Sequence, residues 1–236
     1  MLRTSAWATT WTILRLVMAA AITAAIVTQL VASVTRTAAN GQDVGTVVAN
    51  FFSFFTILSN AGSVVVLAWA AIWYLTRRGA ATHEPRGLAV ALASVTVYMI
   101  VTGIVYNLLL RGIELPQGSQ PVPWSNETLH VVAPIFLLLD LFVGPLRRRL
   151  PWRAVLAIIV FPVVWVIYTL IRGPLVTNPV SADPFWYPYP FLNPNNFANG
   201  YLTVLIYVVG IAVAIVAVAL FVVWIGRRRG SGGNMR

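Results

Sequence analysis

The sequence predicts an all-α, polytopic membrane protein, a single bundle of six transmembrane helices with both termini in the cytoplasm. The chain has 236 residues, is 59% hydrophobic and only 9% charged, and has a mean hydropathy of +0.82. In a soluble domain about a quarter of the residues are charged. The apolar residues gather in six runs, and about 20 apolar residues suffice to cross the hydrocarbon core of a bilayer. All 16 basic residues are arginines, distributed unevenly between the runs.

The predicted spans, in order, are about 13–34, 47–75, 88–110, 128–146, 152–171 and 201–225. They form one domain, residues 1–226, followed by a flexible basic tail at 227–236. The first run follows Arg3 and invites comparison with a signal peptide. It is longer than the roughly 7–15 apolar residues of a signal peptide, so we interpret it as a membrane helix.

The arginines set the predicted orientation. Twelve fall on one set of segments, and Arg15 counts with them: Arg3, Arg77, Arg78, Arg86, Arg147, Arg148, Arg149, Arg153, Arg227, Arg228, Arg229 and Arg236. Only Arg36, Arg111 and Arg172 fall on the other side. Because cytoplasmic loops carry the excess of positive charge, both termini are predicted to be cytoplasmic. The net charge of +10 then reflects topology and anionic lipid headgroups, and nucleic acid is not an expected partner.

Composition also suggests a location. Arginine without lysine is typical of a genome rich in G and C, such as that of an actinobacterium, so we expect a multi-pass protein of a bacterial plasma membrane. The absence of cysteine excludes disulfides and thiolate metal sites. With two histidines and six scattered carboxylates, we expect neither a metal nor a cofactor.

The second span carries a polar stripe. Ser53, Thr56, Asn60 and Ser63 follow one another at steps of three or four residues, which places them on one helix face. A polar stripe of this kind faces the interior of a bundle. Small polar residues commonly join membrane helices, so packing is the alternative to a functional role.

The fourth span opens with a second polar group. Ser125 is predicted to cap the helix, and Glu127 suits the positive end of the helix dipole. His130 follows one turn later and is the only histidine in a predicted span. A neutral imidazole accepts a proton near pH 7 and is a natural general base, with Glu127 or Asn126 holding its other nitrogen. The alternative is an interfacial histidine bonded to a loop.

Residues 173–199 are predicted to form an ordered cap over the outer mouth of the bundle. The segment exceeds the roughly 12–15 residues of an ordinary structureless loop. It is rich in proline and in aromatic residues, which favour burial or the membrane interface. The alternative is a plain aromatic belt. The aromatic residues that we expect to cover the site or contact a substrate are Trp186, Tyr187, Tyr189, Phe191 and Tyr201.

Depth along the spans brings some polar residues to one level. Thr56, His130, Asn107 and Tyr201 are all predicted to lie near the outer surface. Asp140 lies about 15 Å of helix rise below His130, toward the cytoplasm. We expect Asp140 to pair with Arg147 or another inner arginine, because an unpaired carboxylate at that depth is costly.

Several of these motifs resemble a known family. They are Phe-Phe-Thr56-Ile-Leu-Ser-Asn60, the lone His130 opening a helix that later carries Pro134 and an acid, and Tyr-Pro-Phe-Leu before the last span. They resemble an actinobacterial proline-rich, six-helix membrane protein family that is related to the androgen-induced, FAR-17a-like family. Animal members of the latter are membrane hydrolases that use a threonine and a histidine to cleave fatty acid esters of hydroxy fatty acids.

The resemblance implies a lipid-ester hydrolase that opens toward the outer leaflet. Thr56 would be the nucleophile and His130 the base that takes its proton, with formation of an acyl-enzyme. Asn60 or Asn107 would donate to the oxyanion, and Glu127 would support the histidine. The alternative is a non-catalytic membrane protein with the same polar layer, namely a lipid-binding, scaffold or small-solute transport protein.

Overall fold

The computed structural model describes residues 5–77, 83–113 and 121–230, and every regular element within these ranges is helical. Six helices are long and apolar enough to cross a membrane, so the predicted fold class of a multi-pass, all-α bundle is confirmed. In chain order the elements are α1 (Ser5–Ala39), α2 (Val44–Phe51), α3 (Phe55–Thr76), α4 (Arg86–Val105), the π-helical turn η1 (Tyr106–Leu110), α5 (Pro123–Glu127), the π-helical turn η2 (Thr128–Val132), α6 (Ala133–Val143), α7 (Ala154–Arg172), the 3-10 turns η3 (Gly173–Leu175), η4 (Pro190–Leu192) and η5 (Pro194–Asn196), and α8 (Tyr201–Gly230).

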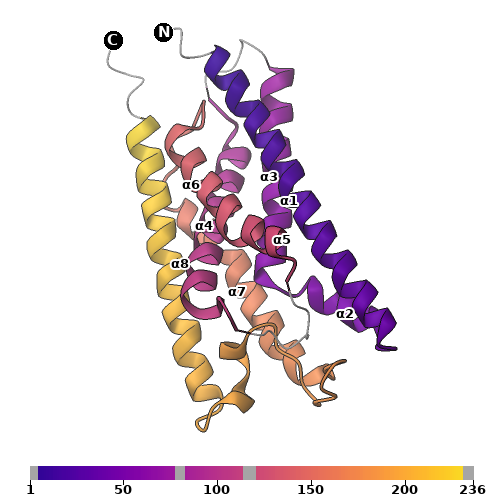
Figure 1. Ribbon diagram of the computed structural model, residues 1–236. Helices are drawn as coiled ribbons and strands as arrows, with labels where there is room; N and C mark the ends of the chain where they lie inside the picture. Colours follow the sequence, from indigo (N-terminus) through magenta and orange to yellow (C-terminus); the bar gives the residue numbers. More distant parts are fainter. Residues whose placement is uncertain (1–4, 78–82, 114–120, 231–236) are drawn as a thin grey trace.

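The bundle has two chemically different ends (Figure 1). Helix α1 begins and α8 ends at the same end of the bundle, which we call the arginine end because the connections there are rich in arginine. The orange segment at 173–199 lies at the opposite end, which we call the cap end. Helix α4 runs through the middle of the bundle. In its most apolar stretch 61% of the residues are buried, against 22% in the corresponding stretches of α1 and α8. The polar groups of interest are therefore arranged around α4.

The second predicted span, 47–75, is wrong as one continuous helix. The chain forms the short helix α2, breaks at residues 52–54, and starts again as α3. Asp43 caps α2 by accepting hydrogen bonds from the backbone of Gly45 and Thr46, at 3.0 and 3.2 Å. Ser53 lies in the break, so the predicted polar stripe begins at Thr56. Hydropathy could not detect the break because the residues around it are mostly phenylalanine.

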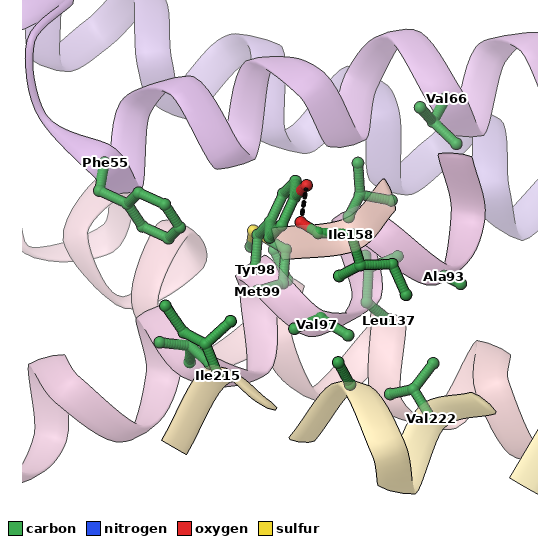
Figure 2. Packing of buried hydrophobic residues seen from close by; sticks show 14 of the residues in the cluster. Phe55, Val66, Ala93, Val97, Tyr98, Met99, Leu137, Ile158, Ile215 and Val222 are labelled. Carbon is green, nitrogen blue, oxygen red and sulfur yellow. Dashed lines mark hydrogen bonds between the residues drawn. The ribbon is translucent and has the colours of Figure 1, made fainter. Parts of the chain in front are cut away.

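Two prolines explain unusual contacts of the central helix. Proline has no N–H and leaves the carbonyl four residues earlier without its helical donor. Pro162 lies inside α7, and the Tyr98 hydroxyl of α4 donates to the freed carbonyl of Ile158 at 2.7 Å (Figure 2). Pro134 follows η2, and the amide of Asn107 donates to the carbonyl of His130 at 3.5 Å. Side chains of α4 and η1 thus satisfy both carbonyls.

The predicted role of Ser125 as a helix N-cap is wrong. Helix α5 starts at Pro123, two residues before Ser125, and its N-cap is Val122. The hydroxyl of Ser125 is fully buried and donates to the carbonyl of Ala25 in α1, at 2.8 Å. Proline is well suited to a first helical position because its fixed φ matches the helix. Ser125 therefore joins two membrane helices.

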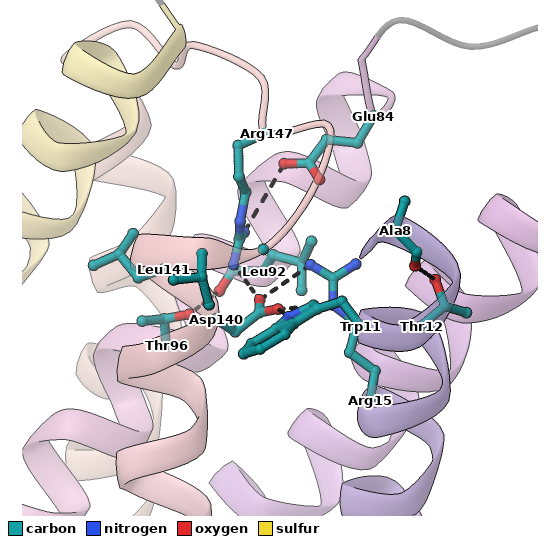
Figure 3. A network of polar contacts seen from close by, with 12 residues as sticks. Ala8, Trp11, Thr12, Arg15, Glu84, Leu92, Thr96, Asp140, Leu141 and Arg147 are labelled. Atoms are coloured by element: carbon teal, nitrogen blue, oxygen red, sulfur yellow. Dashed lines mark hydrogen bonds and ion pairs between the residues drawn. The ribbon is translucent and has the colours of Figure 1, made fainter. Parts of the chain in front are cut away.

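A buried charged network holds the arginine end together (Figure 3). Asp140 of α6 is fully buried and accepts from Arg15 of α1, with Nε–Oδ1 and Nη2–Oδ2 distances of 2.8 and 3.2 Å. Arg147 and the indole N–H of Trp11 also donate to this carboxylate. The expected pairing of Asp140 with Arg147 or another inner arginine is confirmed. Arg15, counted among the topology signals, is a buried ion-pair partner.

Two further features complete this end. Glu84 lies 3.9 Å from Arg147 and is almost fully buried, and burial raises the pKa of its carboxyl. Helix α8 continues to Gly230, so the first residues of the predicted flexible tail are helical. Arg229 donates to the carbonyls of Leu141 and Gly144 at the end of α6. Cations near the C-terminus of a helix stabilise that helix, so Arg229 of α8 stabilises the C-terminal end of α6.

Candidate functional site

The bundle contains an apolar cavity of about 200 Å³ toward the cap end. An engineered cavity of about 150 Å³ in another protein holds benzene, so this volume is large enough for part of a hydrocarbon chain. Val163 of α7 and Ala212 and Val216 of α8 line the cavity and are also exposed on the outside of the bundle. The cavity therefore reaches the surface that faces lipid. Its polar or aromatic polar lining residues are Thr56, Thr102, Tyr106, Trp165 and Tyr189.

Thr56 contributes a hydroxyl to this cavity from the first turn of α3. Its backbone N–H donates to the hydroxyl of Tyr189 at 3.2 Å, and its own hydroxyl lies 3.2 Å from the same oxygen. Phe54, the N-cap residue, has no side chain that can accept a hydrogen bond. Tyr189 therefore caps α3 from the segment at 173–199. Tyr189 is buried, and burial raises the pKa of its hydroxyl further above neutral pH, so the hydroxyl is protonated and able to donate.

His130 lies next to this cavity but is not among the residues that line it. Its Nδ1 lies 2.9 Å from the backbone oxygen of Asn126, so Nδ1 carries the proton and Nε2 is left as an acceptor. Its ring stacks on Tyr106, with centroids 3.9 Å apart. Tyr106 lines the cavity, whereas no hydrogen bond joins His130 to Thr56. Tyr106 thus stands between the imidazole and the cavity.

Asn60 links the two predicted catalytic elements. It is fully buried, and its Nδ2 donates to the carbonyl of Thr56 at 2.9 Å and to that of Leu129 at 3.2 Å. Leu129 directly precedes His130, so the first turn of α3 and the turn η2 are neighbours. Both hydrogen atoms of the Asn60 amide are engaged in this conformation. The residue holds the backbone at both positions together.

Asn107 and Glu127 lie at the exposed edge of the site. Asn107 donates to the carbonyl of Gly103 at 2.8 Å and to that of His130 at 3.5 Å. Glu127 forms a bidentate ion pair with Arg111, at 2.9 and 3.1 Å, with about half of each side chain exposed. Hydrogen bonding to Glu127 raises the pKa of Arg111. Of the two residues expected to hold the imidazole, Asn126 does so, through its backbone.

The predicted cap residues have different positions. Trp186, Tyr187, Tyr189 and Phe191 are buried, whereas Tyr201 is more than half exposed. Only Tyr189 and Phe191 of this set line the cavity. The hydroxyls of Tyr187 and Tyr201 lie 3.1 Å apart, and burial raises the pKa of Tyr187. The segment therefore forms one wall of the cavity with two of its aromatic side chains.

Sequence reasoning missed Tyr106 and Thr102. Both belong to the third span, where a phenol and a hydroxyl in an apolar run were the available signals. The Thr102 side chain is buried, lines the cavity and has no hydrogen-bond partner. Within the described residues no three His, Asp or Glu side chains gather as metal ligands would. Comparisons with family models, with curated proteins and with solved structures find no match.

Proposed function

We propose that this multi-pass membrane protein binds one hydrocarbon chain of a membrane lipid in the apolar cavity. The observation that carries the proposal is the combination of an apolar cavity, a lining that reaches the outer faces of α7 and α8, and hydroxyls on its wall. A chain enters from the lipid phase without crossing water. Its insertion fills space in which the lining side chains otherwise lack partner atoms.

The hydroxyls point to a lipid with a hydrogen-bond acceptor near that chain. Thr102 is buried without a partner, and an unpaired buried hydroxyl is unfavourable. The hydroxyl of Tyr189, which is neutral at neutral pH, can donate a hydrogen bond as well. An ester carbonyl of a glycerolipid or of an acylated fatty acid would accept both kinds of bond. We propose the cytoplasm at the arginine end, in a bacterial plasma membrane, so that the chain comes from the outer leaflet.

A matched pair of variants tests the lipid site. Ala212 and Ala217 are both exposed on α8, but only Ala212 lines the cavity. Ala212→Trp should fill the cavity and remove co-purified lipid detected by native mass spectrometry, whereas Ala217→Trp should retain it. Thr102→Val should weaken retention of ester lipids and leave retention of plain hydrocarbons unchanged. Equal lipid retention in both tryptophan variants would contradict the proposal.

A lipid-ester hydrolase is the second candidate, favoured by the bridge that Asn60 makes between Thr56 and the residue before His130. In this reaction Tyr106 moves aside and His130 Nε2 takes the Thr56 proton. The Thr56 oxygen bonds to the ester carbonyl carbon at the positive end of the α3 dipole, and the protonated imidazole returns the proton to the departing alcohol. Water then releases the fatty acid from Thr56 by the same proton route.

Covalent labelling separates the two candidates. A fluorophosphonate probe should label the wild type and Thr56→Ser but not Thr56→Ala. Loss of the base in His130→Ala should slow labelling by about 10²–10⁴-fold. Labelling that survives Thr56→Ala, or its absence from the wild type in a nanodisc that retains lipid, would exclude the hydrolase and leave the lipid-binding function.

A further inference from the structure

Four buried hydrogen-bond donors without acceptors surround the end of α7. They are Nδ2 of Asn50, Oγ1 of Thr169, Nη1 of Arg172 and Nε1 of Trp186. Asn50, Thr169 and Trp186 are each at least 95% buried. Native proteins leave few such groups unpaired, and each one calls for an explanation. Their gathering at one place indicates a ligand that accepts hydrogen bonds.

The four side chains come from three separate segments: Asn50 and Trp186 contact the guanidinium of Arg172, and Thr169 lies one helical turn before Arg172 on α7. Its Nη2 donates to Oδ1 of Asn50 in α2, at 2.7 Å. Its central carbon lies 5.2 Å from the ring centroid of Trp186 in the segment at 173–199. Thr169 precedes Arg172 by three residues, which places both on one face of α7. The orphan donors of Asn50 and Trp186 therefore belong to groups in direct contact with this cation.

The charge at this place is not balanced by a described carboxylate. The structure gives Arg172 no ion pair with any acid in residues 5–77, 83–113 or 121–230. The acids described at the cap end, Asp43, Glu127 and Asp183, bond to other side chains. Guanidinium, amide and indole N–H groups can only donate, so the missing partner is an acceptor. The positive charge favours an acceptor with a negative charge.

We propose that a small inorganic anion of the size of chloride binds among Asn50, Thr169, Arg172 and Trp186. Asn50, Thr169 and Trp186 are almost fully buried and only Arg172 is partly exposed, which favours a small anion over a lipid headgroup. The bound anion ties the segment at 173–199 to α2 and α7, and the backbone N–H of Trp186 also donates to the carbonyl of Gly173 at 2.9 Å. This site is independent of the proposed lipid function, since none of its four residues lines the apolar cavity.

Anion exchange tests the site in the intact protein. In nanodiscs of phosphatidylcholine, thermal unfolding is followed at constant ionic strength while chloride replaces gluconate, a carboxylate too bulky for a buried site. Saturable binding to the folded state should raise Tm by roughly 2–4 °C. Arg111→Gln, which removes an exposed arginine of the same end, should keep the chloride effect. Arg172→Gln should lose it.

Asn50→Asp gives a second test that does not depend on destabilising the fold. The new carboxylate beside Arg172 replaces the anion, so this variant should be as stable in gluconate as the wild type in chloride. Crystals grown with bromide should show anomalous density beside Arg172. Equal Tm of the wild type in both salts would overturn the proposal, as would a chloride effect that persists in Asn50→Asp. Glu114 lies outside the described residues; a chloride effect that appears only in Glu114→Gln would identify that acid as the counter-ion and overturn the proposal.

Discussion

Loss of the charge on Asp140 should strongly destabilise the bundle. Arg15 is 3% exposed and donates twice to this carboxylate, so Asp140→Asn leaves a buried guanidinium without its counter-ion. Breaking one side of such a pair costs about 3–5 kcal/mol. Asparagine keeps the shape of the side chain and still accepts from Trp11. The loss of unfolding free energy in this variant therefore reports the missing charge and not lost packing.

The assay is reversible unfolding in mixed micelles with increasing sodium dodecyl sulfate, followed by tryptophan fluorescence. Arg15→Met combined with Asp140→Asn also removes the buried charge of Arg15 and should recover part of the loss, because the two residues are directly coupled. Arg147, which also donates to Asp140, keeps Glu84 at 3.9 Å in this double variant. Glu127→Gln is the control, since its ion pair with Arg111 is about half exposed and should contribute far less. If Asp140→Asn costs no more than Glu127→Gln, or if the double variant is as unstable as the two single losses added together, the reasoning is refuted.

Three further predictions concern single side chains. Tyr189→Phe should cost about 1–3 kcal/mol in unfolding free energy, because the backbone N–H of Thr56 loses its acceptor in a buried place. Gly173→Ala should cost about 1–3 kcal/mol, because the added Cβ would overlap the ring of Tyr187. Burial raises the pKa of Glu84 above 4.5, so its contribution to stability is full below that pH and is lost as pH rises through the folded value. The wild type should therefore lose stability relative to Glu84→Gln between pH 4 and neutral pH, as measured by unfolding across this range.

Each of these has a control or a contrary outcome. Gly210→Ala lies within α8, where an added Cβ meets nothing within 4 Å, and it should not destabilise the protein. Unfolding of Tyr189→Phe at the wild-type denaturant concentration would show that the hydroxyl does not cap α3. A wild type that instead gains stability relative to Glu84→Gln as pH rises would show that Arg147 dominates over burial at Glu84.

The membrane fold could be predicted because it depends on a few coarse quantities. Each span needs enough apolar residues to match the thickness of the bilayer. The ranges 88–110 and 201–225 meet this requirement by their composition alone, without knowledge of any contact. The pairing of Asp140 with an arginine could also be predicted, since an isolated buried charge is too costly. The identity of Arg15 as its main partner could not, because the two residues are 125 positions apart in the sequence and hydropathy carries no information on the register of α1 against α6.

The site was less predictable for local reasons. The break before α3 lies in a phenylalanine-rich run and determines that Thr56 sits in a first helical turn, where its N–H needs an outside acceptor. The acceptor, Tyr189, is 133 residues away. Tyr106, which separates His130 from the cavity, lies in the π-helical turn η1, and His130 lies in the π-helical turn η2. No feature of residue spacing signals such turns. Side-chain direction thus depends on backbone irregularities that the sequence pattern does not reveal.

Photo-crosslinking by a lipid with a diazirine near the end of one acyl chain tests the lipid cavity most directly. The protein is irradiated in nanodiscs and the modified peptides are mapped by mass spectrometry. We predict adducts on the inner lining of the cavity, at Val105, Ile159 and Ile211, that disappear in Ala212→Trp and persist in Ala217→Trp. Adducts spread over the outer faces of α1, α7 and α8, with the same pattern in both variants, would contradict a lipid chain within the bundle.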